Sequence, residues 1–244
     1  MLTAMPDALH RLRRPIADLP FRDALLYRIA RVAQRLSARR IRIVKYHLTA
    51  QPVAPAPLLS ARRVGALRVE RIDAHHPLCA ALIAQSPRPP TVIRERLAHG
   101  AVCFAAFKAN ALLGFLWLKH EAYEEDEVHC LFLPRPTEQA AWDFDVWVHP
   151  AHRASRVFLR LWDTAFAYLR ERGVQWTMSR VNAYNPDSLN AHGRLGAVTL
   201  GTATFCCVGT RQWLRVQRSD SLHRQPDRDG RPVLCVFPPR EDAS

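Results

Sequence analysis

Long apolar runs are missing from this sequence of 244 residues, and no stretch approaches the roughly 18 residues that a transmembrane helix needs. The first fourteen residues also lack the apolar block of a secretory signal, so we expect a cytoplasmic protein. Hydrophobic residues nevertheless make up 48% of the chain, which is enough for a sizeable buried core.

Metal-ligand spacing is missing as well. The six cysteines form no C-x-x-C pair, and Cys103, Cys206 and Cys207 lie in apolar runs that look like strands. Cysteines in such runs behave as small buried hydrophobic residues. We therefore expect no metal site and no redox role for them.

Acidic residues are scarce in one part of the chain. Residues 1–63 hold 13 Lys and Arg against 3 Asp and Glu, whereas residues 64–210 are nearly balanced, with 15 against 14. Most of the formal net charge of +13 therefore belongs to the N-terminal part. We predict a basic extension over 1–63, a globular domain over 64–210, and a C-terminal extension over 211–244 that adds a strand or a hairpin.

The basic extension contains a strong helical pattern between Phe21 and Leu36. Apolar residues recur there at three- and four-residue spacing, and four arginines lie mostly on other faces. One interpretation is a helix packed on the domain with a solvated basic face. Another is docking of residues 20–45 on an acidic partner or an anionic membrane surface, which would place the protein at the inner membrane face. Nucleic acid is less favoured, because aromatic residues that would stack on bases are sparse.

Local patterns predict the elements between residues 40 and 139. Three prolines mark an extended linker, and further prolines end one helix and begin the next. An acidic segment is either a solvated loop or a rim that attracts a cationic substrate. We expect a strand over 40–48, the linker over 50–59, a strand over 65–72 and two helices over 77–98. A hairpin over 101–119, the acidic segment over 121–127 and a loop over 131–139 should follow.

A strand over 142–148 carries two carboxylates in an otherwise apolar run. Regular alternation places Asp143, Asp145 and Trp147 on one face. The carboxylates either pair with arginines on an open face or supply a general base, since partial burial raises the pKa of a carboxylate towards the operating pH. For the base we favour Asp145 over Asp143.

A long amphipathic helix is predicted from Phe158 to Leu169, followed by a strand over 174–181. Its apolar stripe is typical of a helix packed on a sheet. Arg153, Ser155 and Arg156 precede the helix, beside backbone N–H groups at the positive end of its dipole. Such an end suits a phosphate or pyrophosphate.

Two runs resemble signatures of the GCN5-related N-acetyltransferase (GNAT) superfamily. The run Val148-x-Pro150-x-x-Arg153 resembles the acyl-CoA-binding segment of that family. Four residues keep the offsets of the family's second signature, namely Asn185, Ser188, His192 and Gly196. The resemblance implies an α/β (α+β) fold with a mixed, mostly antiparallel sheet, a splayed central strand and flanking helices.

The same resemblance implies a co-substrate and a site. Acetyl-CoA or another acyl-CoA would be held by seven residues, two of them through the main chain: Val146, Val148, Arg153, Ser155, Arg156, Asn185 and Ser188. Asn185 would equally serve as a local helix cap. His192 stands where the family has Tyr and would protonate the departing thiolate, because an unperturbed imidazole titrates near pH 6.5; a surface histidine is the alternative. Arg156 and Phe158 replace the small residues of the family's phosphate loop.

The resemblance thus predicts an N-acyltransferase that moves an acyl group, most simply acetyl, from CoA to a primary amine on a small molecule or peptide. Two alternatives stay open. A GNAT-fold binding or regulatory protein without catalysis would explain the altered loop and the missing Tyr. An adaptor that binds a membrane or nucleic acid would explain the basic N-terminal helix. The acceptor and the oligomeric state are not predicted.

Overall fold

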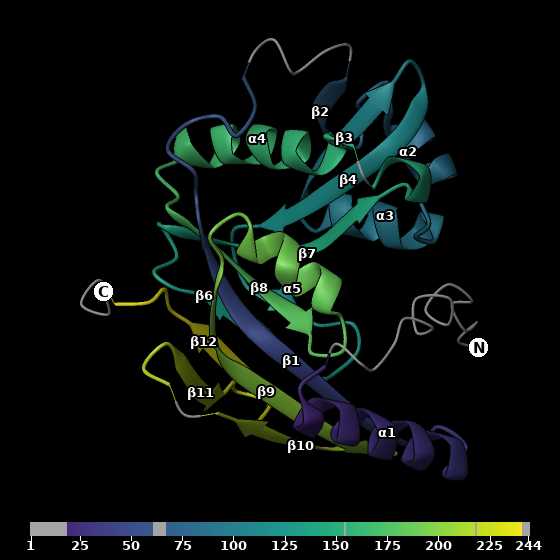
Figure 1. The fold of residues 1–244 in the computed structure, drawn as a ribbon, viewed down its shortest axis with the longest axis vertical. Coiled ribbons are helices and arrows are strands. Elements are labelled where there is room, and N and C mark those ends of the chain that lie inside the picture. Colours follow the sequence, from purple (N-terminus) through teal and green to yellow (C-terminus); the bar gives the residue numbers. More distant parts are fainter. Residues whose placement is uncertain (1–18, 61–66, 154, 218, 241–244) are drawn as a thin grey trace.

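The computed structural model describes residues 19–60, 67–153, 155–217 and 219–240 (Figure 1). Local sequence patterns account for most of its elements, because helical and strand periodicity are local properties. A short 3-10 turn, Pro150–His152, precedes α4. The elements in chain order are α1 (Phe21–Leu36), β1 (Ile41–Pro52), β2 (Arg68–Ile72), α2 (Cys79–Gln85), α3 (Pro90–Ala98), β3 (Val102–Lys108), β4 (Ala111–Lys119), β5 (Tyr123–Glu124), β6 (Leu131–Pro134), β7 (Ala140–Val148), α4 (Val157–Arg170), β8 (Trp176–Asn182), α5 (Pro186–Gly193), β9 (Val198–Val208), β10 (Arg211–Val216), β11 (Leu222–Pro226) and β12 (Pro232–Val236).

The strands form two sheets. The larger has the order β10-β9-β1-β8-β7-β4-β3-β2, and the smaller has the order β11-β12-β6-β5. Neighbouring strands are antiparallel except for the pairs β7–β8 and β12–β6. This mixed, mostly antiparallel α/β arrangement confirms the predicted fold class.

Helices cover both faces of the larger sheet. Alternate residues of β3 point to opposite sides, so Phe104 packs in the cluster of α4 residues while Cys103 packs in the cluster of α2 and α3 residues. A third cluster, which includes Tyr46 and Phe132, fills the space between the two sheets. The stripe predicted on the long helix is buried, as expected, with Leu161 and Phe166 almost fully covered.

Strand β1 is the largest departure from the predicted organisation. We placed residues 1–63 in an extension with a linker from residue 50, but β1 continues to Pro52 and lies between β9 and β8 in the larger sheet. Its alternate residues Tyr46, Leu48 and Ala50 are fully buried. The prolines that indicated a linker stand at and after the end of this strand. The sheet therefore draws on residues outside the predicted limits of 64–210.

Two other predicted loops contain strands. β5 lies within the acidic segment 121–127 and pairs with β6, and β6 lies within 131–139 and pairs in parallel with β12. The residues after 210 add β10 to the larger sheet and the β11–β12 hairpin to the smaller one. None of the described helices is long and apolar enough to span a membrane. The six cysteines carry free thiols; Cys103 and Cys207 are buried, and Cys206 is half-buried.

Candidate active site

The larger sheet opens between β7 and β8. The two parallel strands pair only where Ala140–Trp142 meets Trp176–Met178. Beyond these pairs β7 continues beside β4 and β8 continues beside β1, so the strands diverge like the arms of a V (Figure 1). The predicted main-chain contacts, Val146 and Val148, lie on the diverging part of β7. A strand edge of this kind can bind an extended ligand through its main-chain groups.

A bulge at Phe144 interrupts the alternation of β7 at the same point. Trp117 and Leu118 are neighbours on β4, yet they pair with Asp145 and Asp143, which leaves Phe144 as the extra residue. Neighbouring residues on a strand point to opposite faces, and paired residues share a face. Asp143 and Asp145 therefore lie on opposite faces of the sheet, and our prediction of a common face is wrong.

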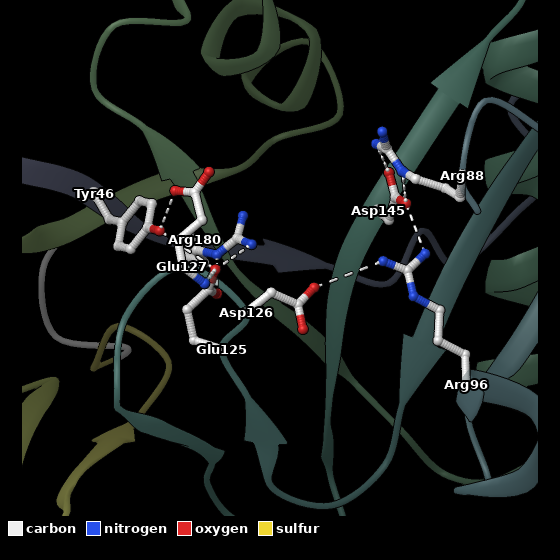
Figure 2. A network of polar contacts seen from close by, with 8 residues as sticks. All are labelled: Tyr46, Arg88, Arg96, Glu125, Asp126, Glu127, Asp145 and Arg180. Carbon is white, nitrogen blue, oxygen red and sulfur yellow. Dashed lines mark hydrogen bonds and ion pairs between the residues drawn. The ribbon is translucent and has the colours of Figure 1, made fainter. Parts of the chain in front are cut away.

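Asp145 lies on the face covered by α2 and α3, where two arginines hold it (Figure 2). Its carboxylate accepts hydrogen bonds from Nε and Nη2 of Arg88 and from Nη1 of Arg96, all at 2.7 Å. Burial raises the pKa of Asp145, but Arg88 and then Arg96 outweigh it and leave the pKa below its usual range. A carboxylate in this state is a poor general base, so the arginine pairing that we held as the alternative describes Asp145.

Asp143 lies on the opposite face and is only 2% exposed. Burial raises the pKa of its carboxyl group to about 7, although the hydroxyls of Thr177 and Ser179 lower it in part. Among the described residues, Asp143 Oδ2 and Thr177 Oγ1 have no hydrogen-bond partner, and neither has Nε2 of Gln51, which pairs with Thr177 across β1 and β8. Buried polar atoms are nearly always hydrogen-bonded. These three atoms therefore favour a polar ligand or water at this place.

His192 of α5 is also buried, and it contacts the same group of polar residues. Its Nδ1 lies 3.0 Å from Oε1 of Gln51, and its ring packs edge-on against Trp162 with centroids 5.7 Å apart. Burial lowers the pKa of His192 to about 4. The imidazole is then neutral at pH 7 and has little of the charged form that donates a proton readily. The structure thus gives His192 a positioning contact with Gln51, whereas proton donation to a thiolate stays a prediction.

The N-terminus of α4 follows the diverging end of β7. Arg153 and Arg156 are exposed there, while Ser155 Oγ donates to the His152 carbonyl at 2.6 Å and accepts from the Val157 N–H at 3.3 Å. Ser155 therefore engages one N–H group of the first turn, that of Val157. The two arginines and the first-turn N–H groups form a donor set that fits a pyrophosphate.

Comparison with known proteins assigns the family. The model of the Acetyltransferase (GNAT) family matches residues 71–197. This chain belongs to the GNAT family. No curated protein matches the sequence.

Three solved structures are similar to parts of this chain at low sequence identity. One is the aminoglycoside acetyltransferase meta-AAC0020 from an uncultured soil metagenomic sample, at 15% identity over 53% of this chain and 87% of that chain, with a TM-score of 0.39. A tandem GNAT protein from the clavulanic acid biosynthesis pathway has 14% identity over 78% and 59%, with a TM-score of 0.45. A functionally unknown conserved protein from Staphylococcus epidermidis has 8% identity over 73% and 66%, with a TM-score of 0.50.

Within this GNAT domain, the segment that resembles the family's phosphate loop keeps a basic character. The ring of Phe158 packs against Trp162, with centroids 6.5 Å apart, and joins the hydrophobic cluster under α4. The bulky replacement is thus turned partly towards the core. On α5, Asn185 Oδ1 accepts from the Ser188 N–H at 3.3 Å, which is the local cap that we held open as an equal alternative. Contact of either residue with a pantetheine arm stays a prediction.

The acidic segment 121–127 folds back on the sheet (Figure 2). Glu125 is buried and pairs with Arg180, whose Nη2 lies 2.7 Å from Oε1. The Tyr46 hydroxyl donates to Glu127 Oε2 at 2.8 Å. Much of the segment's charge is therefore engaged within the protein, which leaves little support for a rim that attracts cationic substrates. No group of three or more His, Cys, Asp or Glu residues in the described part of the chain is arranged to hold a metal ion.

Sequence reasoning missed two residues of the site, Gln51 and Thr177. Both are buried polar residues on central strands, and each has a second polar residue two positions away on the same face, Thr49 and Ser179. Polar residues at alternate positions in an apolar strand were the available signal. In β1 the linker prediction hid that signal.

Proposed function

We propose that this GNAT protein is an N-acyltransferase that uses acyl-CoA, most simply acetyl-CoA, to acylate a primary amine. One observation carries the proposal: β7 and β8 diverge beside the basic N-terminus of α4, and a carboxyl group of raised pKa lies at the point of divergence. Proteins of this family use acyl-CoA as co-substrate. That co-substrate supplies an acyl thioester, which a free amine can attack.

The chain offers separate groups for the two ends of the co-substrate. Arg153 and Arg156 would pair with the pyrophosphate, assisted by the positive end of the α4 dipole. Main-chain groups at Val146 and Val148 would hold the extended arm, because this edge of β7 has no strand neighbour among the described residues. Binding of acyl-CoA would therefore depend little on which side chains β7 carries and strongly on the positive charge at the N-terminus of α4.

Asp143 is the proposed proton acceptor. A primary amine is mostly protonated at neutral pH and must lose a proton before it can act as a nucleophile. A carboxylate with a pKa of about 7 can accept that proton near neutral pH, whereas Asp145 is held ionised by two arginines. The unpartnered groups of Thr177 and Gln51 are suited to hold a water that carries the proton to Asp143, with His192 fixing the Gln51 amide.

Calorimetry on the intact protein tests co-substrate binding. We expect acetyl-CoA or a longer acyl-CoA to bind, and Arg156→Ala to weaken binding, because a charge-assisted pair with phosphate is removed. Arg172→Ala is the matched control, since it removes an arginine just beyond the opposite end of the same helix. Failure of every acyl-CoA to bind would overturn the proposal.

CoA release in the presence of a panel of amines tests catalysis. Removing a general base typically lowers the rate by a factor of about 100 to 10,000, so we expect Asp143→Asn to lose transfer while it keeps acyl-CoA binding. An unchanged rate in this variant would show that Asp143 is not the base. The panel should contain small amines and peptides, since the structure favours neither class.

A GNAT-fold binding protein without catalysis is the second candidate. The observation that favours it is that neither His192 nor Asp145 is poised for proton transfer at neutral pH, because one is neutral and the other is paired. Binding of acyl-CoA with no CoA release across the amine panel would support this candidate.

A further inference from the structure

Helix α1 presents its apolar stripe to solvent. Five large hydrophobic side chains stand out along it: Phe21 is 81% exposed, Leu25 47%, Ile29 49%, Val32 54% and Leu36 84%. At 100° per residue they fall on one narrow face of the helix. The predicted helix is therefore present, but its apolar face points away from the domain.

The opposite face attaches α1 to the domain. Lys45 Nζ donates to Asp23 Oδ1 at 2.5 Å, the ring of Tyr27 packs on Tyr184 with centroids 4.9 Å apart, and Ala30 is buried. These three contacts fix the rotation of α1 about its axis. The exposed stripe follows from this attachment, since the two faces lie on opposite sides of the helix.

Positive charge surrounds the apolar stripe. Arg22, Arg28 and Arg35 are exposed beside it, and Arg31 is half-buried. The only acidic residue of α1, Asp23, is buried and paired with Lys45. The outer surface of α1 is therefore apolar along its centre and basic along its margins.

We propose that α1 docks this protein on an anionic lipid bilayer surface. The five apolar side chains would enter the boundary between headgroups and acyl chains, and the arginines would lie at the lipid phosphates. A second copy of the chain is a poorer occupant, because it would bring arginines against arginines with no free carboxylate on either helix. Charge complementarity thus selects the anionic bilayer.

Docking through α1 leaves the basic N-terminus of α4 accessible. In Figure 1 α1 lies at one end of the molecule and α4 lies at the other. The N-terminus of α4 would thus stay in the aqueous phase, where a soluble co-substrate is available. The docking proposal does not depend on the proposed acyl transfer, and its test does not use activity.

Vesicle flotation with the full chain tests the proposal. We expect binding to vesicles of phosphatidylcholine with one-third phosphatidylglycerol, little binding to phosphatidylcholine alone, and release as salt rises. Val32→Glu should weaken binding about tenfold or more, because it places a charge in the apolar stripe. Val198→Glu is the matched control at 43% exposure on β9, and we expect it to bind as the wild type does.

Arginine variants provide a second, independent reading. Arg28→Ala and Arg35→Ala should each weaken binding to the anionic vesicles about fivefold and lower its salt dependence. Absence of binding by the full chain, equal binding to neutral vesicles, or no effect of Val32→Glu would each overturn the proposal. A dimer in sedimentation equilibrium that Val32→Glu dissociates would assign the stripe to a second copy instead.

Discussion

The two carboxylates of β7 lie two residues apart and have opposite chemistry. Asp145 faces α2 and α3, where Arg88 and Arg96 hold it ionised, whereas Asp143 faces α4 and α5, where burial raises its pKa to about 7. One extra residue in the strand, Phe144, separates them onto the two faces. Two aspartates of one strand thus differ in pKa because they lie on different faces of the sheet, among different neighbours.

Removing the charge of Asp145 should have the largest effect on stability. Asp145→Asn would leave two mostly buried guanidinium groups, with 19% and 14% side-chain exposure, without their counter-ion. Breaking a buried pair in this way costs about 3–5 kcal/mol, which urea unfolding can measure. Asp126→Asn is the control: Asp126 is 72% exposed and 3.9 Å from Arg96, so we expect a change below about 0.5 kcal/mol. Equal losses of stability in the two variants would contradict the role of Asp145 as the buried counter-ion of Arg88 and Arg96.

Asp143→Asn should instead stabilise the protein at high pH. The folded pKa of Asp143 is about 7 against an ordinary value of 3.8, so its ionisation is disfavoured in the folded state. Stability from this group is full below pH 3.8 and is lost as the pH rises towards 7, by at most about 4 kcal/mol. The variant lacks this loss, so it should match the wild type at pH 4 and exceed it at pH 8. Urea unfolding at both pH values checks the sign, and a variant that is destabilised at pH 8 would contradict it.

Local elements could be predicted from the sequence, because their cause lies within them. The apolar stripe placed a helix over 158–169, and α4 spans Val157–Arg170. The apolar runs around 108–111 placed the β3–β4 hairpin. The place of β1 could not be predicted in the same way, since its partners in β8 and β9 lie more than a hundred residues further along the chain.

The candidate site shows the same division. The sequence singled out Asp143 and Asp145 as the important carboxylates, but their order of preference was reversed by contacts that lie far apart in sequence. The bulge at Phe144 depends on the register with β4, and the pairing with Arg88 joins residues 57 positions apart. Neither the bulge nor the ion pair can be predicted from the alternation of residues in β7 alone.

His192 extends the comparison to a buried, neutral base on the same face as Asp143. Its folded pKa is about 4 against 6.5 in its ordinary state, so the unfolded chain binds a proton between these values and the folded protein does not. Stability from this group is full above pH 6.5 and is lost as the pH falls towards 4, by about 3 kcal/mol. His192→Gln should flatten the acid limb of a stability curve over this range. A slope equal to that of the wild type would assign the acid limb to other groups.

The smallest effect is expected at Thr177, and it sharpens the account of Asp143. Thr177→Val removes a buried hydroxyl that makes no well-formed hydrogen bond among the described residues, yet lies close enough to Asp143 to lower its pKa. We expect a stability change of about 1 kcal/mol or less, because no made hydrogen bond is lost, together with a higher pKa of Asp143 in an NMR titration.

Thr49→Val is the matched control on the neighbouring strand. The Thr49 hydroxyl makes a 2.9 Å hydrogen bond with Ser179 Oγ, so this variant leaves a buried hydroxyl unpaired and should lose about 1–3 kcal/mol. The two Thr→Val changes are chemically identical and lie on adjacent strands of one face. If they proved equally costly, Thr177 Oγ1 would have a partner in solution. A water held beside Asp143 would be that partner, and its presence would support the proposed transfer of a proton from the amine to Asp143 through water.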